Sequence, residues 1–232
     1  TGNVLAVAQA LGKVPLVMYT GTSTEYWTRA ASLVHTDVTG KADAELDPHV
    51  RVYFIAGGQH QNTRTSTRST NAHLGNPLDQ SAPLRALLVA MDRWAADGTL
   101  PPPSRYPRID RGELVPVEQH RQRFPAMPGM RHPGALLQPP RVDFGPRFWS
   151  EGIIDTQPPA FGTPYMTLVP NVDADGNELG GIRTPDVAVP LGTYAGWNPR
   201  GAAIGASNHL ARWAGSFFPF AKTEDERRSG GD

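Results

Sequence analysis

A histidine and a glutamate each follow a strand-like run that stops at glycine. Residues 50–56 are apolar and β-branched and end at Gly57 and Gly58, with His60 just beyond; residues 14–20 end at Gly21, with Glu25 shortly after. Open α/β sheets carry their chemistry at the carboxyl ends of strands. An imidazole with one nitrogen on a carboxylate can act as a general base. We therefore expect His60 and Glu25 to be the base and the acid of a catalytic triad.

Each of these residues also has an ordinary interpretation. A histidine after a strand is often a plain loop residue, and a glutamate in the first turn of a helix is favoured by the helix dipole. Asp37 and Asp47 are rival acids, but both lie farther from the end of the first strand than Glu25 does. Asp37 is kept as the reserve acid.

The nucleophile is missing from this pattern. The chain has no cysteine and no Gly-x-Ser-x-Gly elbow; Ser23 fits a helix cap, and Ser207 follows no strand. In α/β-hydrolases the serine precedes the acid and the histidine, so the order here predicts a serine before residue 1. The start at Thr1, rather than at Met, leads us to expect processing or truncation.

Composition limits the partners. Lys and Arg number 22 and Asp and Glu number 22, so no large field of one sign is available for nucleic acid or an anionic membrane. No apolar run reaches the roughly 18 to 20 residues of a membrane span. We expect a soluble protein with a small-molecule partner, and the compartment stays open between cytoplasm and export.

No metal or other cofactor is expected. The histidines lack ligand spacing. Residues 171–182 partly match a calcium loop, with Asp173, Asp175, Gly176 and Asn177 at suitable offsets. Ile182 stands where the loop needs a bidentate glutamate. This favours a simple Asp-Gly turn, in a hairpin that joins residues 166–169 to the segment from Ile182 onward.

The predicted elements follow α/β order over residues 1–98. We expect helices over 4–11, from 23 or 24 to 34, and over 81–97, around parallel strands at 14–20 and 50–56; residues 35–49 and 61–80 are loops. From residue 99 to 170 the chain is rich in proline, which disfavours regular helix. We expect residues 99–232 to wrap the same core with loops and short antiparallel strands.

Several phrases resemble a family of bacterial alpha/beta hydrolase domain-containing proteins, over its C-terminal half. They cover nearly the whole chain: TGTSTEYW (20–27), AASLVHTD (30–37), GGQH (57–60), LRALLVAMDRW (84–94), PPPSRYP (101–107), VPNVDADGN (169–177), PLGTYAGWN (190–198) and GSFFPFA (215–221). One departure is Gln61, where members of the family show glycine after the histidine.

The resemblance implies the C-terminal portion of an α/β-hydrolase sheet, in which Glu25 and His60 are triad acid and base and a serine elbow lies upstream. It implies a carboxylic ester hydrolase whose N-terminal segment is supplied by the same polypeptide or by a separate chain. Tyr26, Trp27, Gly58 and Gln59 are candidates for the substrate pocket, with aromatic packing as the alternative for Tyr26 and Trp27. A binding or structural module without catalysis, or an acyltransferase or lyase, are the rival functions.

Overall fold

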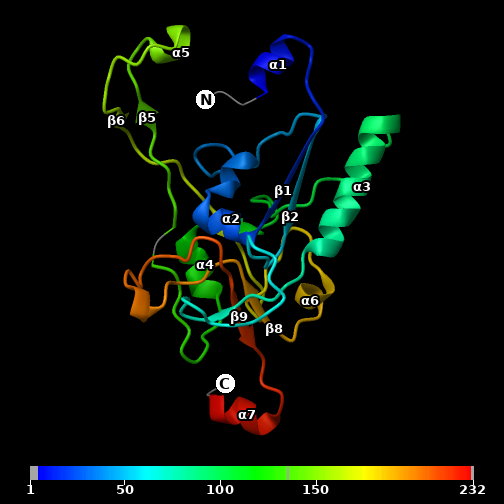
Figure 1. Ribbon diagram of the computed structural model, residues 1–232, viewed down its shortest axis with the longest axis vertical. Helices are drawn as coiled ribbons and strands as arrows, with labels where there is room; N and C mark the ends of the chain where they lie inside the picture. Colours follow the sequence, from blue (N-terminus) through cyan, green and yellow to red (C-terminus); the bar gives the residue numbers. More distant parts are fainter. Residues whose placement is uncertain (1–4, 135, 231–232) are drawn as a thin grey trace.

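Two parallel strands form the centre of the fold. In the computed structural model, which describes residues 5–134 and 136–230, β1 (Val17–Thr22) pairs with β2 (Val50–Ile55) in parallel. The register aligns Val17 with Val50 and Thr22 with Ile55, so both strands end at the same edge. The helix and loop that follow these strands therefore start side by side (Figure 1).

The two strands differ in how their edges are covered. β2 is almost wholly buried, and its second edge bonds single residues of the later chain: Arg105 pairs with Tyr53, and Ile182 with Ile55. β1 is only partly buried, and among the described residues no strand other than β2 pairs with it. β1 is thus an open sheet edge, the kind of edge that readily accepts a further strand.

The expected crossover helix is shorter than predicted. α2 ends at Thr28 (Ser23–Thr28), and a separate 3-10 turn, η1, covers Ala31–Val34. The break lies at Ala30, whose φ of 55° is left-handed and cannot continue a right-handed helix. The break allows Ser32 to be buried, where its hydroxyl oxygen accepts the backbone N–H of Leu168 at 3.0 Å.

Two other predicted helices are present. α3 (Ser81–Asp97) has the bounds that its apolar period predicts, and it ends at Gly98 with φ 77°, a left-handed C-cap. α1 (Ala6–Ala10) lies inside the range expected for the first helix, whose residue 4 falls outside the described residues.

The later part of the chain adds short strands and helices. The antiparallel strands are β3 (Leu74–Gly75), β9 (Ser216–Pro219) and β8 (Gly192–Ala195) in one sheet, β4 (Leu114–Val115) with β7 (Val169–Pro170), and β5 (Val142–Asp143) with β6 (Ala160–Phe161). The remaining helices are α4 (Val117–Arg123), α5 (Phe148–Glu151), α6 (Pro185–Ala188), η2 (Ala202–Ile204) and α7 (Glu224–Gly230).

Two expectations for this region need correction. The proline-rich stretch does contain two short helices, α4 and α5. α4 fits between Pro116 and Pro125 and carries basic residues in its last turn, where the helix dipole favours them. The predicted hairpin is also different, because Ile182 pairs with β2 instead of with residues 166–169. The Asp-Gly turn itself is present, closed by a bridge between Val172 and Glu178.

Residues from both parts of the chain share one core. The main cluster joins Tyr26, Trp27 and Val52 from the first 98 residues to Val169 and Trp197 from the later chain. The wrapping segments therefore complete the hydrophobic interior around β2, and they hold the loops at its carboxyl end.

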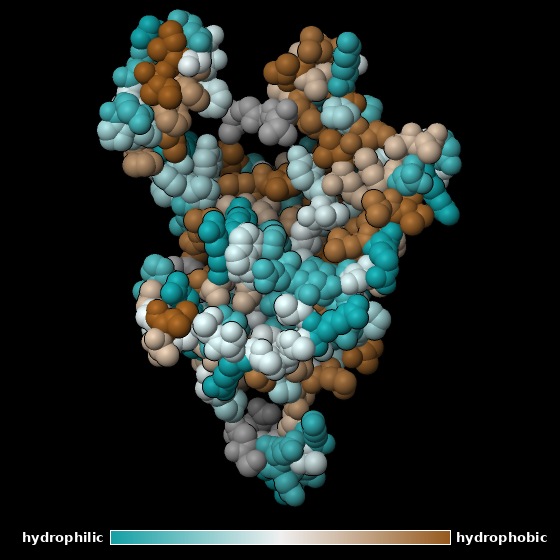
Figure 2. Space-filling model, in the orientation of Figure 1, coloured by the Kyte–Doolittle hydropathy of each residue, from teal (hydrophilic) through white to brown (hydrophobic). Residues whose placement is uncertain are grey.

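Several apolar side chains lie on the surface. Figure 2 shows hydrophobic residues on α1, on α3 and at the tip of the arm that carries α5. The most exposed include Val7 and Leu11 near α1, Leu88 on α3, and Trp149 and Phe161 on the arm. Within the described residues, no helix combines the length and hydrophobicity needed to cross a bilayer.

Candidate active site

Glu25 is held by the turn that connects β1 to α2. Residues 22–25, here called the acid turn, form a capping box: one carboxylate oxygen of Glu25 accepts the backbone N–H of Thr22 at 2.7 Å and its hydroxyl at 2.6 Å. A capping box satisfies the free amides at a helix start and fixes the side chain of its acidic member. The second oxygen of Glu25 is left to point away from the turn.

That second oxygen meets His60. Residues 57–60, the histidine loop, leave β2 at the same sheet edge, and Nδ1 of His60 hydrogen-bonds Oε1 of Glu25. The imidazole is 44% exposed and the carboxylate 18%. Among the described residues none hydrogen-bonds Nε2 of His60, so this nitrogen faces outward from the pair. The structure therefore brings the two predicted residues together, with the geometry of a base and its orienting acid.

Glycines allow the two loops to lie this close. Gly57 has a φ of 65°, and a Cβ there would lie 2.8 Å from the carbonyl oxygen of Tyr194; a Cβ on Gly58 would lie 3.2 Å from Cβ of Thr22. The backbone N–H of Thr24 donates to the carbonyl of Gly58 at 3.3 Å. A larger residue at position 58 would press on the acid turn, and one at position 57 would press on Tyr194.

A second carboxyl group, which the sequence did not indicate, lies beneath both loops. Glu178 is 5% exposed; Oε1 accepts the hydroxyl of Ser23, and Oε2 accepts the backbone N–H of Gly57 at 2.8 Å. Burial raises the pKa of Glu178 to about 7, against the opposing effect of these two bonds. Its partners are 155 and 121 residues away in the chain, so no local spacing could have shown it.

Trp213 forms one wall beside the imidazole. Its ring centroid lies 4.3 Å from that of His60, and the guanidinium of Arg29 lies 4.6 Å from the same indole. A hollow of about 370 Å³ opens here, lined by Trp213, Arg212, Gln59, Gln61 and mainly hydroxyl-bearing residues of the segment 63–71. Neither His60 nor Glu25 lines this polar hollow, but both chain neighbours of His60 and the indole beside it do, and the hollow is large enough for a small molecule.

The other predicted pocket residues take different places. Tyr26 and Trp27 are each 1% exposed and belong to the main core, as the packing alternative expects. Gly58 is buried between the two loops, whereas Gln59 does line the polar hollow.

The two rival acids hydrogen-bond to residues close to them in the sequence. The carboxylate of Asp37 accepts bonds from its neighbours in the chain, including the backbone N–H of Lys41 at 2.7 Å and of Ala42 at 2.9 Å. Asp47 pairs with His49 at 3.0 Å on the surface. Neither carboxylate bonds His60, which leaves Glu25 as the acid of the pair.

The residues of the calcium-like segment bond one another. One oxygen of Asp173 accepts the backbone N–H of Asp175 at 3.1 Å and of Asn177 at 2.9 Å, and the other pairs with Arg183 at 3.2 Å. The described residues contain no group of three or more His, Asp or Glu side chains placed to hold a metal ion. The segment is built as an Asx-type turn that leads into Glu178.

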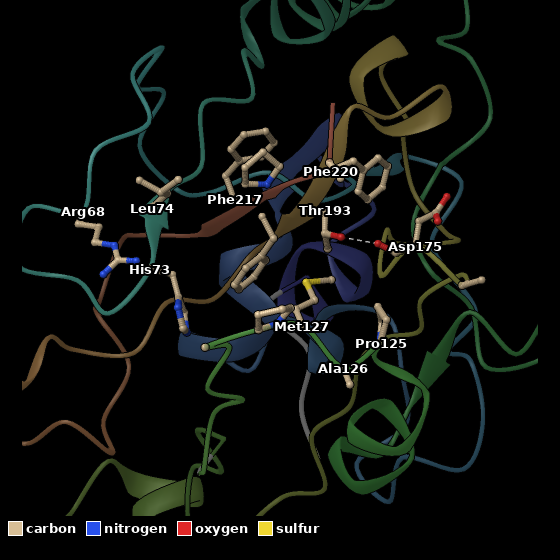
Figure 3. Close-up of a pocket in the computed structure, with 16 residues that line it drawn as sticks. Arg68, His73, Leu74, Pro125, Ala126, Met127, Asp175, Thr193, Phe217 and Phe220 are labelled. Atoms are coloured by element: carbon tan, nitrogen blue, oxygen red, sulfur yellow. Dashed lines mark hydrogen bonds between the residues drawn. The ribbon is translucent and has the colours of Figure 1, made fainter. Parts of the chain in front are cut away.

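A larger cavity lies apart from the dyad. It has a volume of about 570 Å³ and is lined by aromatic and proline side chains of β9 and of the segment after α4, with Arg68 and His73 at one side (Figure 3). None of its lining residues belongs to the acid turn or the histidine loop. Its size alone therefore does not make it the reaction site.

Comparison with known protein families gives one match. Residues 10–229 match the alpha/beta hydrolase domain family. The chain belongs to this family. The match extends over nearly the whole alpha/beta hydrolase chain, so residues on both sides of position 98 are part of it. No curated protein and no solved structure matches this alpha/beta hydrolase sequence.

Proposed function

We propose that this alpha/beta hydrolase acts on carboxylic esters as a serine hydrolase, with His60 as general base and Glu25 as its orienting acid. The observation behind the proposal is the bond from Nδ1 of His60 to Glu25, which leaves Nε2 without a hydrogen-bond partner among the described residues. A carboxylate on Nδ1 fixes the tautomer in which Nε2 can accept a proton, and it stabilises the imidazolium that forms.

In the proposed reaction a serine hydroxyl attacks the ester carbonyl and passes its proton to Nε2 of His60. The tetrahedral intermediate collapses as His60 returns the proton to the leaving alcohol, and water then releases the acid from the acyl-enzyme by the same route. Backbone amides near the serine elbow would hold the oxyanion. The polar hollow at Trp213 would receive one end of the ester.

The serine is proposed to lie on a segment N-terminal to these residues, in the same polypeptide or in a separate chain. Two features support this placement. Within the described residues Nε2 of His60 has no hydrogen-bond partner, and β1 offers an open parallel edge beside the dyad. A neighbouring strand at that edge would bring its own carboxyl end, and a nucleophile on it, to the same side of the sheet.

The test is labelling of the native preparation with a fluorophosphonate, followed by peptide mapping. One serine should be labelled, and His60→Gln should slow labelling and ester hydrolysis by about 10³-fold or more, since the base is lost. His49→Gln is the matched control, because His49 also bonds a carboxylate through Nδ1 but lies on the surface; it should leave the rate unchanged.

The alternatives predict different results. A binding module would show no labelled serine at all. An acyltransferase would be labelled but would turn over an ester only with an acceptor alcohol present. Equal labelling of the wild type and His60→Gln would contradict the proposed role of His60, and a labelled serine among residues 1–232 would contradict the upstream placement.

A further inference from the structure

The dyad is held by two loops that are far apart in sequence, and one buried side chain touches both. Glu178 accepts one bond from Ser23 in the acid turn and one from Gly57 in the histidine loop. Ser23 lies two positions before Glu25, and Gly57 lies three before His60. A shift of either loop relative to the other would stretch a bond at Glu178.

We propose that Glu178 is a positioning residue, which couples the acid turn to the histidine loop and so sets the Glu25–His60 bond. This inference rests on the proposed function of the dyad, because it assigns Glu178 a role in that same site. Glu178 does not itself touch the reacting groups. It acts through the two loops that carry them.

The segment before Glu178 is built to hold it still. The side chain of Asn177 is fully buried and bridges to β8, since it donates to the carbonyl of Gly192 at 3.1 Å and accepts the backbone N–H of Tyr194 at 2.9 Å. The backbone N–H of Leu179 donates to the carbonyl of Asn171 at 3.0 Å. Glu178 is therefore fixed by its neighbours on both sides in the chain. The Asp-Gly turn thus has a structural role, the placement of Glu178, that differs from metal binding.

Two buried hydrogen-bond donors explain why a carboxyl group at this position matters and why its loss would be felt at the site. The carboxyl receives two donors, one on each oxygen, and a side chain that cannot bond would leave the Gly57 amide and the Ser23 hydroxyl unsatisfied in the interior. Glutamine keeps both links, because its oxygen can accept from Gly57 while its NH₂ donates to the Ser23 oxygen. Methionine has a similar shape and keeps neither.

Most other anchors of the two loops lie on one side only. Asn76 donates to the carbonyl of Gly57 at 2.6 Å, and Gln80 donates to the carbonyl of Gln59 at 3.1 Å, but these bonds do not reach the acid turn. Thr24 bonds Gly196 at 2.6 Å without reaching the histidine loop. The direct bond between Thr24 and Gly58 is long, at 3.3 Å. Glu178 thus adds a buried side-chain link to this backbone bond between the acid turn and the histidine loop.

The test compares Glu178→Met with Glu178→Gln by proton NMR of the Nδ1–H of His60, assigned by its loss in His60→Gln. In Glu178→Met we expect this proton to move upfield and to exchange with water about tenfold faster or more, the effect of losing one hydrogen bond that orders the loops. Glu178→Gln should keep both the shift and the exchange rate close to the wild type.

A matched control separates positioning from general loss of stability. The side chain of Asp43 is 7% exposed; its carboxylate accepts two backbone amides, those of Ile109 and Asp110, both at 3.0 Å, and pairs with Arg108 at 3.5 Å. Asp43→Asn should leave the His60 proton unchanged. All variants are measured at a temperature at which circular dichroism shows them folded.

The result that would overturn the inference is a folded Glu178→Met protein with the wild-type His60 proton. Loss of the His60 proton signal in Asp43→Asn to the same extent as in Glu178→Met would also overturn the inference, because that result would show a global effect. The readout does not need ester turnover, so it is distinct from the labelling test: Glu178 can fail as a positioning residue while His60 still proves essential for labelling, and the reverse outcome is equally visible.

Discussion

Glu25 and His60 lie 35 residues apart in sequence and share a hydrogen bond because their strands are parallel neighbours with aligned ends. The capping box fixes one oxygen of Glu25 on Thr22 and thereby aims the other at Nδ1 of His60. Helix capping and orientation of the base are thus two roles of a single carboxylate.

Gly196 should be irreplaceable behind the acid turn. A Cβ at this position would lie 2.0 Å from Oγ and 2.6 Å from the backbone carbon of Ser23, so Gly196→Ala must push the acid turn aside. We expect a loss of about 3 kcal/mol in the free energy of unfolding, as for an overpacked core, together with a weakened His60 Nδ1 proton signal. Urea unfolding and NMR measure the two effects.

Gly134→Ala is the control for that substitution, because a Cβ at Gly134 would meet no atom within 4 Å. It should change stability little. A Gly196→Ala protein as stable as the wild type would show that the acid turn can move away without cost, which the close packing does not allow.

The pKa of Glu178 should give the protein a stability that falls as the pH rises. Its folded pKa of about 7 lies above the usual 4.5, so the folded state binds the proton more tightly than the unfolded state does. This contribution is complete below about pH 4.5 and is lost as the pH rises through 7, by on the order of 3 kcal/mol. Glu178→Gln cannot titrate.

The measurement is urea unfolding of the wild type and Glu178→Gln between pH 5 and 8. The variant should gain stability relative to the wild type as the pH rises. Glu118→Gln, at an exposed glutamate on α4, serves as the control. A difference between wild type and Glu178→Gln that is independent of pH would contradict a raised pKa.

His35 should make the stability of the protein fall as the pH is lowered, which is the opposite of the effect of Glu178. It is fully buried beside Tyr26, whose hydroxyl lies 2.7 Å from Nε2, and burial lowers the pKa of His35 to about 4. As the pH falls, the unfolded state therefore takes up the proton at a higher pH than the folded state does. The stability that neutral His35 contributes is present above about pH 6.5. That contribution is lost as the pH falls toward 4, by on the order of 3 kcal/mol.

Urea unfolding between pH 7 and 4 tests this effect. The free energy of unfolding of His35→Asn should fall less steeply between pH 7 and 4 than that of the wild type, although the variant is less stable at pH 7. His49→Asn, at an exposed histidine, should keep the wild-type slope. If His35→Asn loses stability as steeply as the wild type does, another group is responsible for the acid limb.

The sequence could predict what depends on local pattern and chain order. Two apolar runs ending in glycine predict the parallel pair and place Glu25 and His60 at one edge; the apolar period of α3 and Gly98 predict that helix to its ends. Ala30 breaks the crossover helix through tertiary packing of Ser32, which no local signal shows. Glu178 was missed for the same reason, because its importance comes from two partners more than a hundred residues away.

The tautomer of His60 in Glu25→Gln shows whether Glu25 orients the imidazole. The amide oxygen must stay on the two donors of Thr22, so its NH₂ faces Nδ1 of His60 and forces the proton onto Nε2, where a serine needs an acceptor. Nitrogen-15 NMR should show an Nδ1–H tautomer in the wild type and an Nε2–H tautomer in the variant, with ester hydrolysis slower by about 10⁴-fold. An unchanged tautomer and an unchanged rate in the folded variant would contradict the account.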